Sequence, residues 1–524
     1  MRILIVTGQL AKQSVEKHAF ASSNETEVLA LPVSVAALLT PSQIAAEIQK
    51  RKVRGFDLIL VPGLVKGNLS VIEELSTIPV FKGPKYVADL PLVLKHINDI
   101  TLSKSVPACE LFKNELQQQA LQALERVEQN RNTLLKKPGN VLVGNVAIGK
   151  AFPMRVMAEI LDAPLLSDHD LLKQAAYYRE SGAQIIDIGM IQGQSRPKDA
   201  ERAVRVVKQS LNLPVSIDTF DLSEAKAAIR GGADILLSVD AGNVEEVAKL
   251  SSNIMVVVVP TNHREGYFPK GVSERVTALE ENIKQSVELG IKNIIGDIIL
   301  DPVNMPGIVE SICAYKEFSQ RNPEIPLLCG VGNVTELLDA DTVGANALLA
   351  GIASELDVSI LLTTEGSNKA RGSVKELATA SKLMFLAKKR NSAPIDLGLD
   401  LLLLKDKRLR DEPYDRQVDE CTRVIRAKVF EEDYHDPKGV FKILVDRKEK
   451  RLVATRFVGK TQEEIIMGET AEEMIMTIVN MGFISSLSHA AYVGKELYKA
   501  EIALKTGKTF IQDEPLFNYD LKEG

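Results

Sequence analysis

The chain has 524 residues, of which 45% are hydrophobic and 26% are charged, as in soluble globular proteins. At about 150 residues per domain, this length predicts several domains, each with its own core. There are 64 Lys and Arg and 70 Asp and Glu residues, so the net charge is −6, and no basic domain or tail could follow a phosphate backbone. The charge therefore argues against nucleic acid as a partner and favours a small molecule.

Cysteine use and hydropathy indicate the compartment. Cys109, Cys313, Cys329 and Cys421 are far apart and show no CxxC spacing, which argues against a disulfide framework and a structural zinc and indicates a reducing environment. No run of about 18 apolar residues occurs, and the apolar run in the first ten residues is too short for a signal peptide. We expect a cytoplasmic protein without a membrane segment.

Residues 1–104 predict an α/β domain of the doubly wound kind. Apolar runs and amphipathic stretches alternate over 2–8, 26–32, 41–52 (helical), 57–63 and 85–97. Gly8 and Gly63 follow strand ends, where such sheets open a ligand crevice. Glycine after a strand more often serves a turn, so we favour a structural or partner-docking domain over a ligand site.

Residues 105–140 read as a helical linker, because from Ala108 apolar residues recur at helical spacing without Gly or Pro until 138–140. From 141 to 392 eight strand signals each precede a helical stretch, as in a (β/α)8 TIM barrel. A doubly wound sheet is the alternative. The expected strands are 155–160, 184–189, 214–219, 234–239, 254–261, 293–302, 326–333 and 357–364.

Residues 415–524 predict a small α+β domain. A period-two pattern runs through 428–458 around a hairpin turn at 446–449, and two helical stretches follow at 469–482 and 488–508. His489 lies in the second of these stretches, where a lone histidine is more often packed or capping than a ligand.

Reactive groups of a barrel lie at the carboxyl ends of its strands. Polar residues at the expected strand ends are Glu159, Asp187, Asp218, Ser238, Asp240, Asp301 and Asn333, and the loop after the second strand carries Ser195 and Arg196. Carboxylates can accept paired hydrogen bonds from an amidine-like edge, so this set suits a flat heterocycle rich in N–H donors. Taken singly, Asp218 could instead cap the next helix.

Several stretches between 141 and 390 resemble the pterin-binding barrels, the family of dihydropteroate synthase and the methyltetrahydrofolate or methyltetrahydropterin methyltransferases. The motifs are SGAQIIDIGMIQGQSRPKDA (181–200), PVSIDTF (214–220), GGADILLSV (231–239), PTNHREGYFPKG (260–271) and IILDPVN (298–304). With its flanking domains, the chain looks like the archaeal dihydropteroate synthase-related proteins.

The resemblance implies roles for these residues. Asp218 and Asp301 would accept hydrogen bonds from a reduced pterin of the methanopterin or folate type, and Asp187 would order the end of the second strand. Arg196 falls on the arginine of a mobile loop, and with Ser195 and His263 it would hold a phosphate or second substrate. Glu159 is a candidate metal ligand.

The chain also departs from the family pattern. At the end of the fourth strand the family has an asparagine where this chain has Leu237 and Ser238, so one pterin contact is lost or moves to Ser238, Asp240 or Asn243. CGVGNVTEL (329–337) resembles the methyltransferases, with Asn333 at the asparagine that supports transfer from N5. The synthase's Arg-x-His pair on the eighth strand is replaced by TTEGSNKARGS (363–373), so a phosphate there would need Ser367, Lys369 or Arg371.

Three functions follow from the resemblance. The first is a transferase of the synthase kind, which joins a hydroxymethyl-dihydropterin pyrophosphate, with Mg²⁺, to an arylamine. The second is a methyltetrahydropterin methyltransferase with a corrinoid or other acceptor. The third is a non-catalytic pterin-binding protein. Arg196 and Asn333 are the catalytic candidates; we also expect a homodimer and a protein partner for the N- or C-terminal domain.

Overall fold

The computed structural model describes residues 1–20, 24–250, 253–407, 423–427 and 436–517. It divides into two compact units, residues 1–412 and 413–524. Cys421 and residues 428–435 of the expected period-two segment lie outside the described residues. Among the described helices, none is both long enough and apolar enough to cross a membrane.

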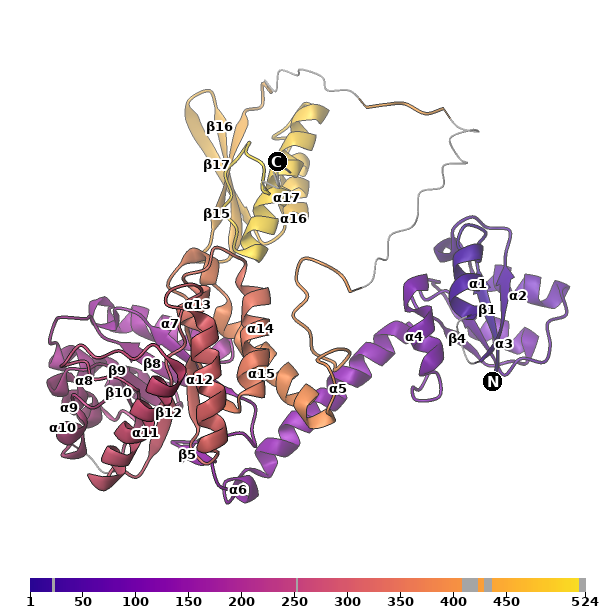
Figure 1. Ribbon diagram of the computed structural model, residues 1–524. Helices are drawn as coiled ribbons and strands as arrows, with labels where there is room; N and C mark the ends of the chain where they lie inside the picture. The colour runs from indigo at the N-terminus through magenta and orange to yellow at the C-terminus, as the bar shows by residue number, and fades with distance from the viewer. Residues whose placement is uncertain (21–23, 251–252, 408–422, 428–435, 518–524) are drawn as a thin grey trace. The chain divides into compact units, whose positions relative to one another are not determined.

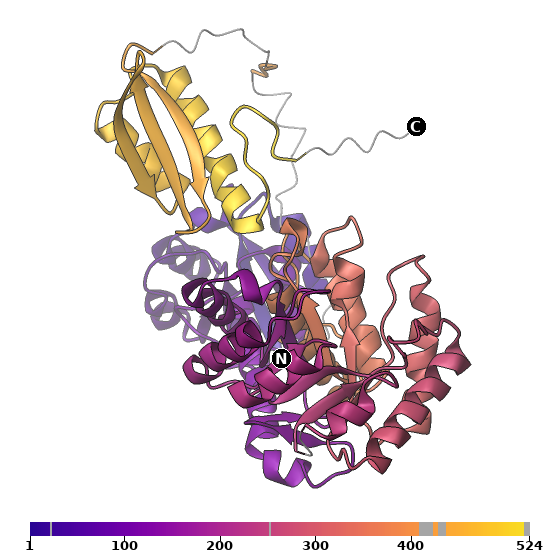
Figure 2. The ribbon, with the colours of Figure 1, turned by 90° about the vertical axis from the view of Figure 1, so that its left-hand side faces the viewer.

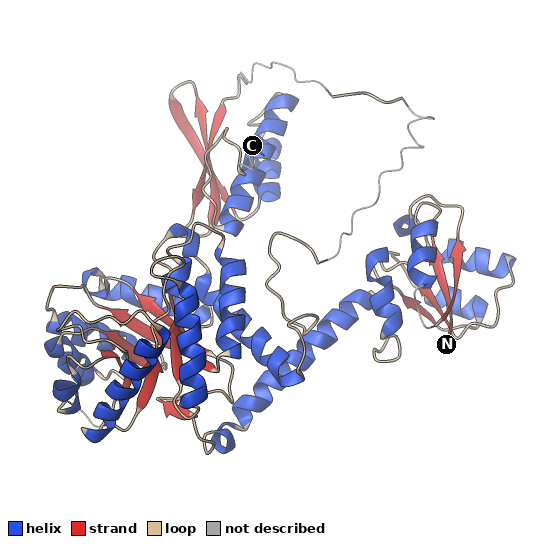
Figure 3. Cartoon of the chain, viewed as in Figure 1, coloured by secondary structure: helices blue, strands red, loops and turns tan. Residues whose placement is uncertain are grey.

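The first 104 residues contain a parallel sheet with the order β2-β1-β3-β4 and helices on both faces, as a doubly wound fold requires (Figure 3). Its strands are β1 (Arg2–Thr7), β2 (Glu25–Ala30), β3 (Leu58–Val61) and β4 (Val80–Lys82). Helices α2 (Pro41–Lys50) and α3 (Ser70–Ser76) pack on one face, and α1 (Lys12–Phe20) and α4 (Leu90–Lys95) pack on the other.

The loops at the strand ends of this sheet explain two of its glycines. A Cβ at position 8 would lie 2.8 Å from the backbone nitrogen of Ala36, and one at position 63 would lie 2.7 Å from the carbonyl oxygen of Gly83. Neighbouring backbone therefore fills both positions, in agreement with the structural interpretation of Gly8 and Gly63.

The long helix α5 (Ala108–Gln129) follows, and the short α6 (Arg131–Leu134) continues it after a break at Asn130 (Figure 1). Then β5 (Val141–Val143) and β6 (Val146–Ile148) form an antiparallel hairpin that the sequence analysis missed. Val143 and Ile148 belong to the apolar cluster that fills the barrel interior, so this hairpin closes one end of the barrel.

Eight parallel strands form a closed barrel in the order β7-β8-β9-β10-β11-β12-β13-β14, with β14 paired to β7. This confirms the TIM barrel. The strands are β7 (Arg155–Ile160), β8 (Ile185–Gly189), β9 (Val215–Asp218), β10 (Ile235–Val239), β11 (Met255–Val258), β12 (Ile294–Asp297), β13 (Leu327–Gly330) and β14 (Val358–Thr364).

Helices surround the barrel and bury its outer strand faces in the largest apolar cluster of the protein. They are α7 (Asp168–Glu180), α8 (Pro197–Ser210), α9 (Leu222–Gly231), α10 (Val244–Ala248), α11 (Val272–Glu288), α12 (Ile308–Arg321), α13 (Gly332–Thr335), α14 (Thr342–Glu355) and α15 (Ser373–Arg390). Because side chains alternate along each strand, inward positions such as Met157, Ile185 and Ile295 form a separate interior cluster.

The second unit is an antiparallel sheet of β15 (Val440–Asp446), β16 (Arg451–Val458) and β17 (Thr461–Gly468), with α16 (Ala471–Asn480) and α17 (Leu487–Thr506) on one face (Figure 2). The hairpin turn lies between Asp446 and Arg451, as expected. Strand β17 was missed by the sequence analysis.

Candidate functional site

Three carboxylates converge at the carboxyl ends of β7, β8 and β9. Glu159, Asp187 and Asp218 each offer an oxygen that lies within 4.8 Å of the others. Each stands two residues beyond an inward side chain (Met157, Ile185 and Ser216), so the period of two turns all three toward the barrel axis. Asp187 is fully buried, and its Oδ1 accepts a hydrogen bond from Ser216 Oγ at 2.5 Å.

The surroundings of the three carboxylates favour their neutral forms. Burial, followed by the charges of Asp218 and Asp162, raises the pKa of Glu159 to about 7. Burial and the charge of Asp297 raise the pKa of Asp218 to about 6. Burial also raises the pKa of Asp187 well above its usual value. Perturbed carboxyl groups of this kind are typical of functional sites, so the barrel mouth is the candidate site.

Asp297, which the sequence analysis did not select, ends β12 on the far side of the mouth from β7 and β8. Its Oδ1 accepts hydrogen bonds from Tyr315 Oη at 2.5 Å and from the Ile299 backbone at 2.8 Å. Burial raises the pKa of Asp297 to about 6, against the lowering effect of the Tyr315 hydrogen bond. The signal in the sequence is a lone carboxylate two residues after the inward Ile295.

Asp301 does not end a strand, because β12 stops four residues earlier. Its buried carboxylate forms an ion pair with the buried guanidinium of Arg275 from α11. Arg275 also donates to the Ile299 carbonyl at 2.8 Å. Asp301 therefore supports the loop after β12. The strand-end position that the sequence analysis expected for Asp301 is occupied by Asp297.

Asn333 lies in α13, just after β13, and its side chain is exposed. Its Nδ2 donates to the Leu300 carbonyl oxygen at 3.0 Å, which ties α13 to the loop after β12. The sequence allowed Asp218 to cap the helix after β9. The structure shows that Asp221 caps this helix, α9, because its side chain accepts from the backbone groups of Ser223 and Glu224. Asp218 is therefore left without a capping role.

Asp240, after β10, is fully buried, and its carboxylate is occupied by neighbouring groups. It accepts from Thr261 Oγ1 at 2.8 Å, from the His263 backbone at 2.7 Å and from the Gly242 backbone at 2.9 Å, and it pairs with His263 Nδ1 at 2.8 Å. His263 lies against the ring of Phe220, with centroids 4.5 Å apart. Asp240 thus orients His263, and Asn243 Nδ2 donates to the Ser238 carbonyl at 3.0 Å.

Ser195 and Arg196 lie in the loop before α8. Ser195 Oγ contacts Ser223 Oγ at 2.9 Å, and the Arg196 backbone donates to Glu224 Oε1 at 2.7 Å. The Arg196 guanidinium donates to Gln194 Oε1 at 3.0 Å and forms a longer pair with Asp199 at 3.8 Å. These contacts are local, so the guanidinium could turn to a ligand without breaking the core.

On the eighth strand the chain's own carboxylates occupy the expected anion site. Glu336 accepts from the backbone groups of Gly366 at 3.0 Å and Ser367 at 3.2 Å. Glu365 accepts from the backbone of Val374, at the start of α15, at 3.2 Å. Lys369 pairs with Asp339 at 3.4 Å, and Arg371 is exposed.

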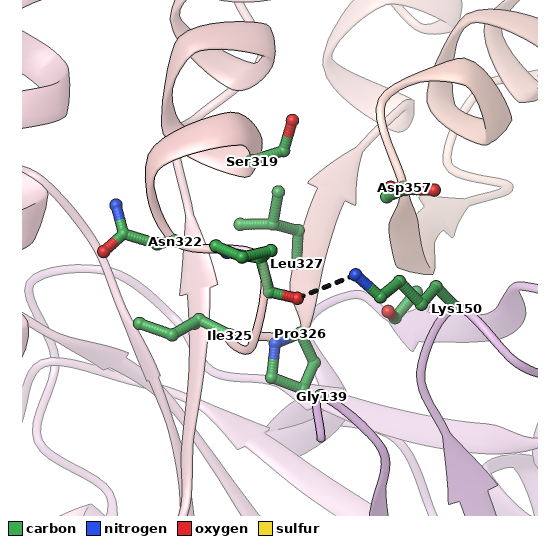
Figure 4. A pocket seen from close by; sticks show the side chains of 10 residues that line it. Gly139, Lys150, Ser319, Asn322, Ile325, Pro326, Leu327 and Asp357 are labelled. Carbon is green, nitrogen blue, oxygen red and sulfur yellow. Dashed lines mark hydrogen bonds between the residues drawn. The ribbon is translucent and has the colours of Figure 1, made fainter. Parts of the chain in front are cut away.

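Two features elsewhere are structural. An open hollow of about 260 Å³ lies at the amino end of the barrel, where Lys150 Nζ donates to the Pro323 carbonyl at 3.0 Å (Figure 4). That end of a TIM barrel serves stability rather than catalysis. In the second unit His489 is buried and pairs with Asp436 at 3.1 Å, as expected of a packed histidine.

Comparisons with known proteins assign the parts of this chain to families. Residues 162–354 match the model of the family described as pterin binding enzyme, residues 435–513 match PterinBD-DUF4346, and residues 1–85 match a family of unknown function, DUF6513. The chain belongs to the pterin-binding, dihydropteroate synthase-like family.

This chain is similar to the following proteins. The uncharacterized protein MJ0107 of Methanocaldococcus jannaschii is 40% identical over 537 residues, which cover 99% of each chain. Dihydropteroate synthase of Bacillus subtilis is 30% identical over 137 residues, 24% of this chain and 46% of the synthase. A solved Yersinia pestis dihydropteroate synthase with a pterine-sulfa conjugate is 18% identical, covers 48% of this chain and 99% of its own, and has a TM-score of 0.38.

Proposed function

We propose that the barrel mouth binds a reduced pterin and that the chain is a transferase acting on it. The observation that carries this proposal is the pair Asp218 and Asp297. Both carboxylates end barrel strands at the mouth, and, besides burial, the charge of Asp297 helps to raise the pKa of Asp218. A pterin ring presents amino and ring N–H groups on one edge, and carboxylates are the acceptors that bind such an edge most strongly. Phe220, 40% exposed, offers a ring face for stacking beside His263.

Transfer of a methyl group from N5 of the pterin is the reaction that this geometry favours. A pyrophosphate leaving group would need an anion site, yet Glu336 and Glu365 already occupy the backbone donors after β14. The mouth itself contains carboxylates, which suit a pterin that gains positive charge. Asn333 follows β13 at the same end of the barrel and is exposed; in this reaction it would support the protonated N5 as charge develops there.

The synthase-like reaction is the second candidate, and Arg196 favours it. Its guanidinium is about one-third exposed and makes only local contacts in the described structure. Guanidinium groups pair with phosphate oxygens in a bidentate manner. In this reaction Arg196 and Ser195 would hold the pyrophosphate or the arylamine, with Mg²⁺ bound to the pyrophosphate.

Calorimetry with two ligands and two variants separates these reactions. If methyl transfer is correct, a methyl-tetrahydropterin binds more tightly than a hydroxymethyl-dihydropterin pyrophosphate with Mg²⁺. Arg196→Ala then leaves the affinity for the methyl-tetrahydropterin unchanged, and Asn333→Ala lowers turnover in a separate activity assay. The opposite ligand preference, with a loss confined to Arg196→Ala, would establish the synthase reaction. Equal small effects throughout would leave a non-catalytic binding protein.

A further inference from the structure

The part of the chain that the structure describes does not neutralise the carboxylates of Glu159 and Asp218. Among the described residues, none donates a hydrogen bond to either carboxylate, and no Lys, Arg or His forms an ion pair with them or with Asp187. Elsewhere in the mouth the acidic groups are satisfied: Asp301 by Arg275, and Asp240 by Thr261 and His263. Three carboxylates that are close together and uncompensated repel one another, so such an arrangement calls for a cation or for bound protons.

One oxygen of the cluster, Asp187 Oδ2, is buried and accepts no hydrogen bond from the described residues. Asp187 has 0% exposure, and its Oδ1 accepts from Ser216 Oγ at 2.5 Å, whereas its Oδ2 has no hydrogen-bond partner among the described residues. A buried carboxylate oxygen without a donor is costly and rare. Because Ser216 fixes the orientation of the carboxylate, the free oxygen is held at the floor of the mouth, below the two partly exposed acids.

The backbone around the cluster makes room for it. In the barrel register Glu159 lies opposite Asp187, and Gly189 lies opposite Asp218. A Cβ at position 189 would lie 2.6 Å from Glu159 Oε1. Glycine at this strand end therefore lets the Glu159 carboxylate lie over β8, beside the other two acids.

We propose that Glu159, Asp187 and Asp218 form a binding site for one divalent cation of the Mg²⁺ or Mn²⁺ class. All three donors are carboxylate oxygens, which hard cations prefer and which zinc and copper sites use less. Three protein ligands at the floor of an open mouth leave the remaining positions of such an ion for water or substrate. These three ligands are brought together by the fold itself, without a bound pterin.

The test is a titration of the full chain with Mn²⁺ at pH 7.5 without pterin. The electron paramagnetic resonance signal of free Mn²⁺ measures how much of the ion is bound. The wild-type protein should bind one ion. Ligand charge count sets affinity at such sites, so E159Q and D187N should each weaken binding by about tenfold or more. E180Q removes an exposed carboxylate at the end of α7 and should bind like the wild type.

Gly189→Ala provides a variant that keeps every charge. Its Cβ would displace the Glu159 carboxylate, so it should weaken Mn²⁺ binding as E159Q does. If D187N fails to fold, E159Q, whose side chain is partly exposed, decides the result. The proposal is overturned if the wild type binds no Mn²⁺ saturably, or if E159Q binds it as E180Q does. Pterin binding measured separately in the presence of a chelator tests the proposed function alone.

Discussion

Asp297 and Asp301 are close in sequence but differ in their partners. Asp297 accepts from a neutral hydroxyl, that of Tyr315, and is partly exposed, whereas Asp301 neutralises a buried guanidinium. A carboxylate that already satisfies a buried cation has little to offer a ligand. On this difference we propose that Asp297 contacts the ligand and that Asp301 supports the scaffold.

Replacing Asp297 by Asn should therefore weaken pterin binding. The change keeps the shape of the side chain and an oxygen acceptor for Tyr315, but it removes the charge from the hydrogen bond to the ring. Losing a charge-assisted hydrogen bond costs about 1.5–3 kcal/mol, so affinity should fall roughly 10- to 150-fold in calorimetry while the melting temperature stays close to that of the wild type. Unchanged affinity would remove Asp297 from the site.

Asp301→Asn is the matched comparison, and it should act on stability. It leaves Arg275 buried without its counter-charge, and breaking a buried ion pair in this way costs about 3–5 kcal/mol. Urea unfolding should show this loss. A stable D301N protein with weakened pterin binding would reverse the two assignments.

The pKa of Asp297, about 6, predicts a pH dependence of binding. The carboxylate accepts two N–H bonds only when ionised, so pterin affinity should be flat above pH 7 and fall as the pH drops below about 6. Asp218 titrates in the same range, so in D297N the fall should become shallower rather than vanish. Calorimetry from pH 5 to 8 measures both profiles.

The contribution of Asp297 to stability should change with pH in the opposite direction to its contribution to binding. The folded pKa of Asp297 lies above its unfolded value of 3.8, so its contribution to stability is complete below about pH 4 and is lost as the pH rises through about 6. Other carboxylates, such as Asp221 with its lowered pKa, act in the opposite direction, so the Asp297 contribution is measured as the stability of the wild type relative to D297N. A difference between the two proteins that does not change between pH 4 and 8 would contradict the account.

At the scale of elements, the hairpin of β5 and β6 closes the amino end of the barrel. Ile148 is fully buried in the interior cluster, where it joins Met157 and Ile185, whereas Leu142 on the same hairpin is 51% exposed. The hairpin is short and lies far from the mouth, so it supports the barrel strands without touching the ligand site.

Ile148→Ala should lower the free energy of unfolding of the barrel by about 2–5 kcal/mol, because it leaves a cavity among interior side chains. Leu142→Ala should change it by less than about 0.5 kcal/mol. Denaturant unfolding of both variants checks this, and pterin affinity of the folded protein should be unchanged in each. Equal effects of the two substitutions would contradict the closing role of Ile148.

The elements differed in how far the sequence predicted them. The eight barrel strands are apolar runs separated by amphipathic helices, so their pattern is strong. Strand β17 (TQEEIIMG) has its polar residues first and its apolar residues after them, so it lacks a period of two, and β5 and β6 have only three residues each. The signals of all three strands are therefore weak. The apolar run after β12 continues to Leu300, which concealed the strand end at Asp297.

The site was predicted in the same uneven way. Glu159, Asp187 and Asp218 follow directly from strand ends, and the structure brings them together. The pairing of Asp301 with Arg275, and the occupation of the β14 loop by Glu336, join elements that are distant in sequence. No local pattern reports such contacts, so they required the structure.

At the scale of the whole molecule, a pterin-family barrel is combined with an N-terminal doubly wound sheet and a C-terminal α+β unit. The similarity to MJ0107 runs through all three parts, whereas the B. subtilis synthase match covers 24% of the chain. This chain and MJ0107 therefore share the flanking parts as well as the barrel. Their roles, including the homodimer and the protein partner expected from the sequence, stay predictions.

The central claim is that the mouth of this barrel binds a reduced pterin through strand-end carboxylates. Calorimetric titration of the full chain and of D218N with a methyl-tetrahydropterin tests it most directly. The account predicts one site in the wild-type chain and roughly 10- to 150-fold weaker binding in D218N, from the lost charge-assisted hydrogen bond. Absence of binding to the wild type, or equal binding by a correctly folded D218N, would contradict it.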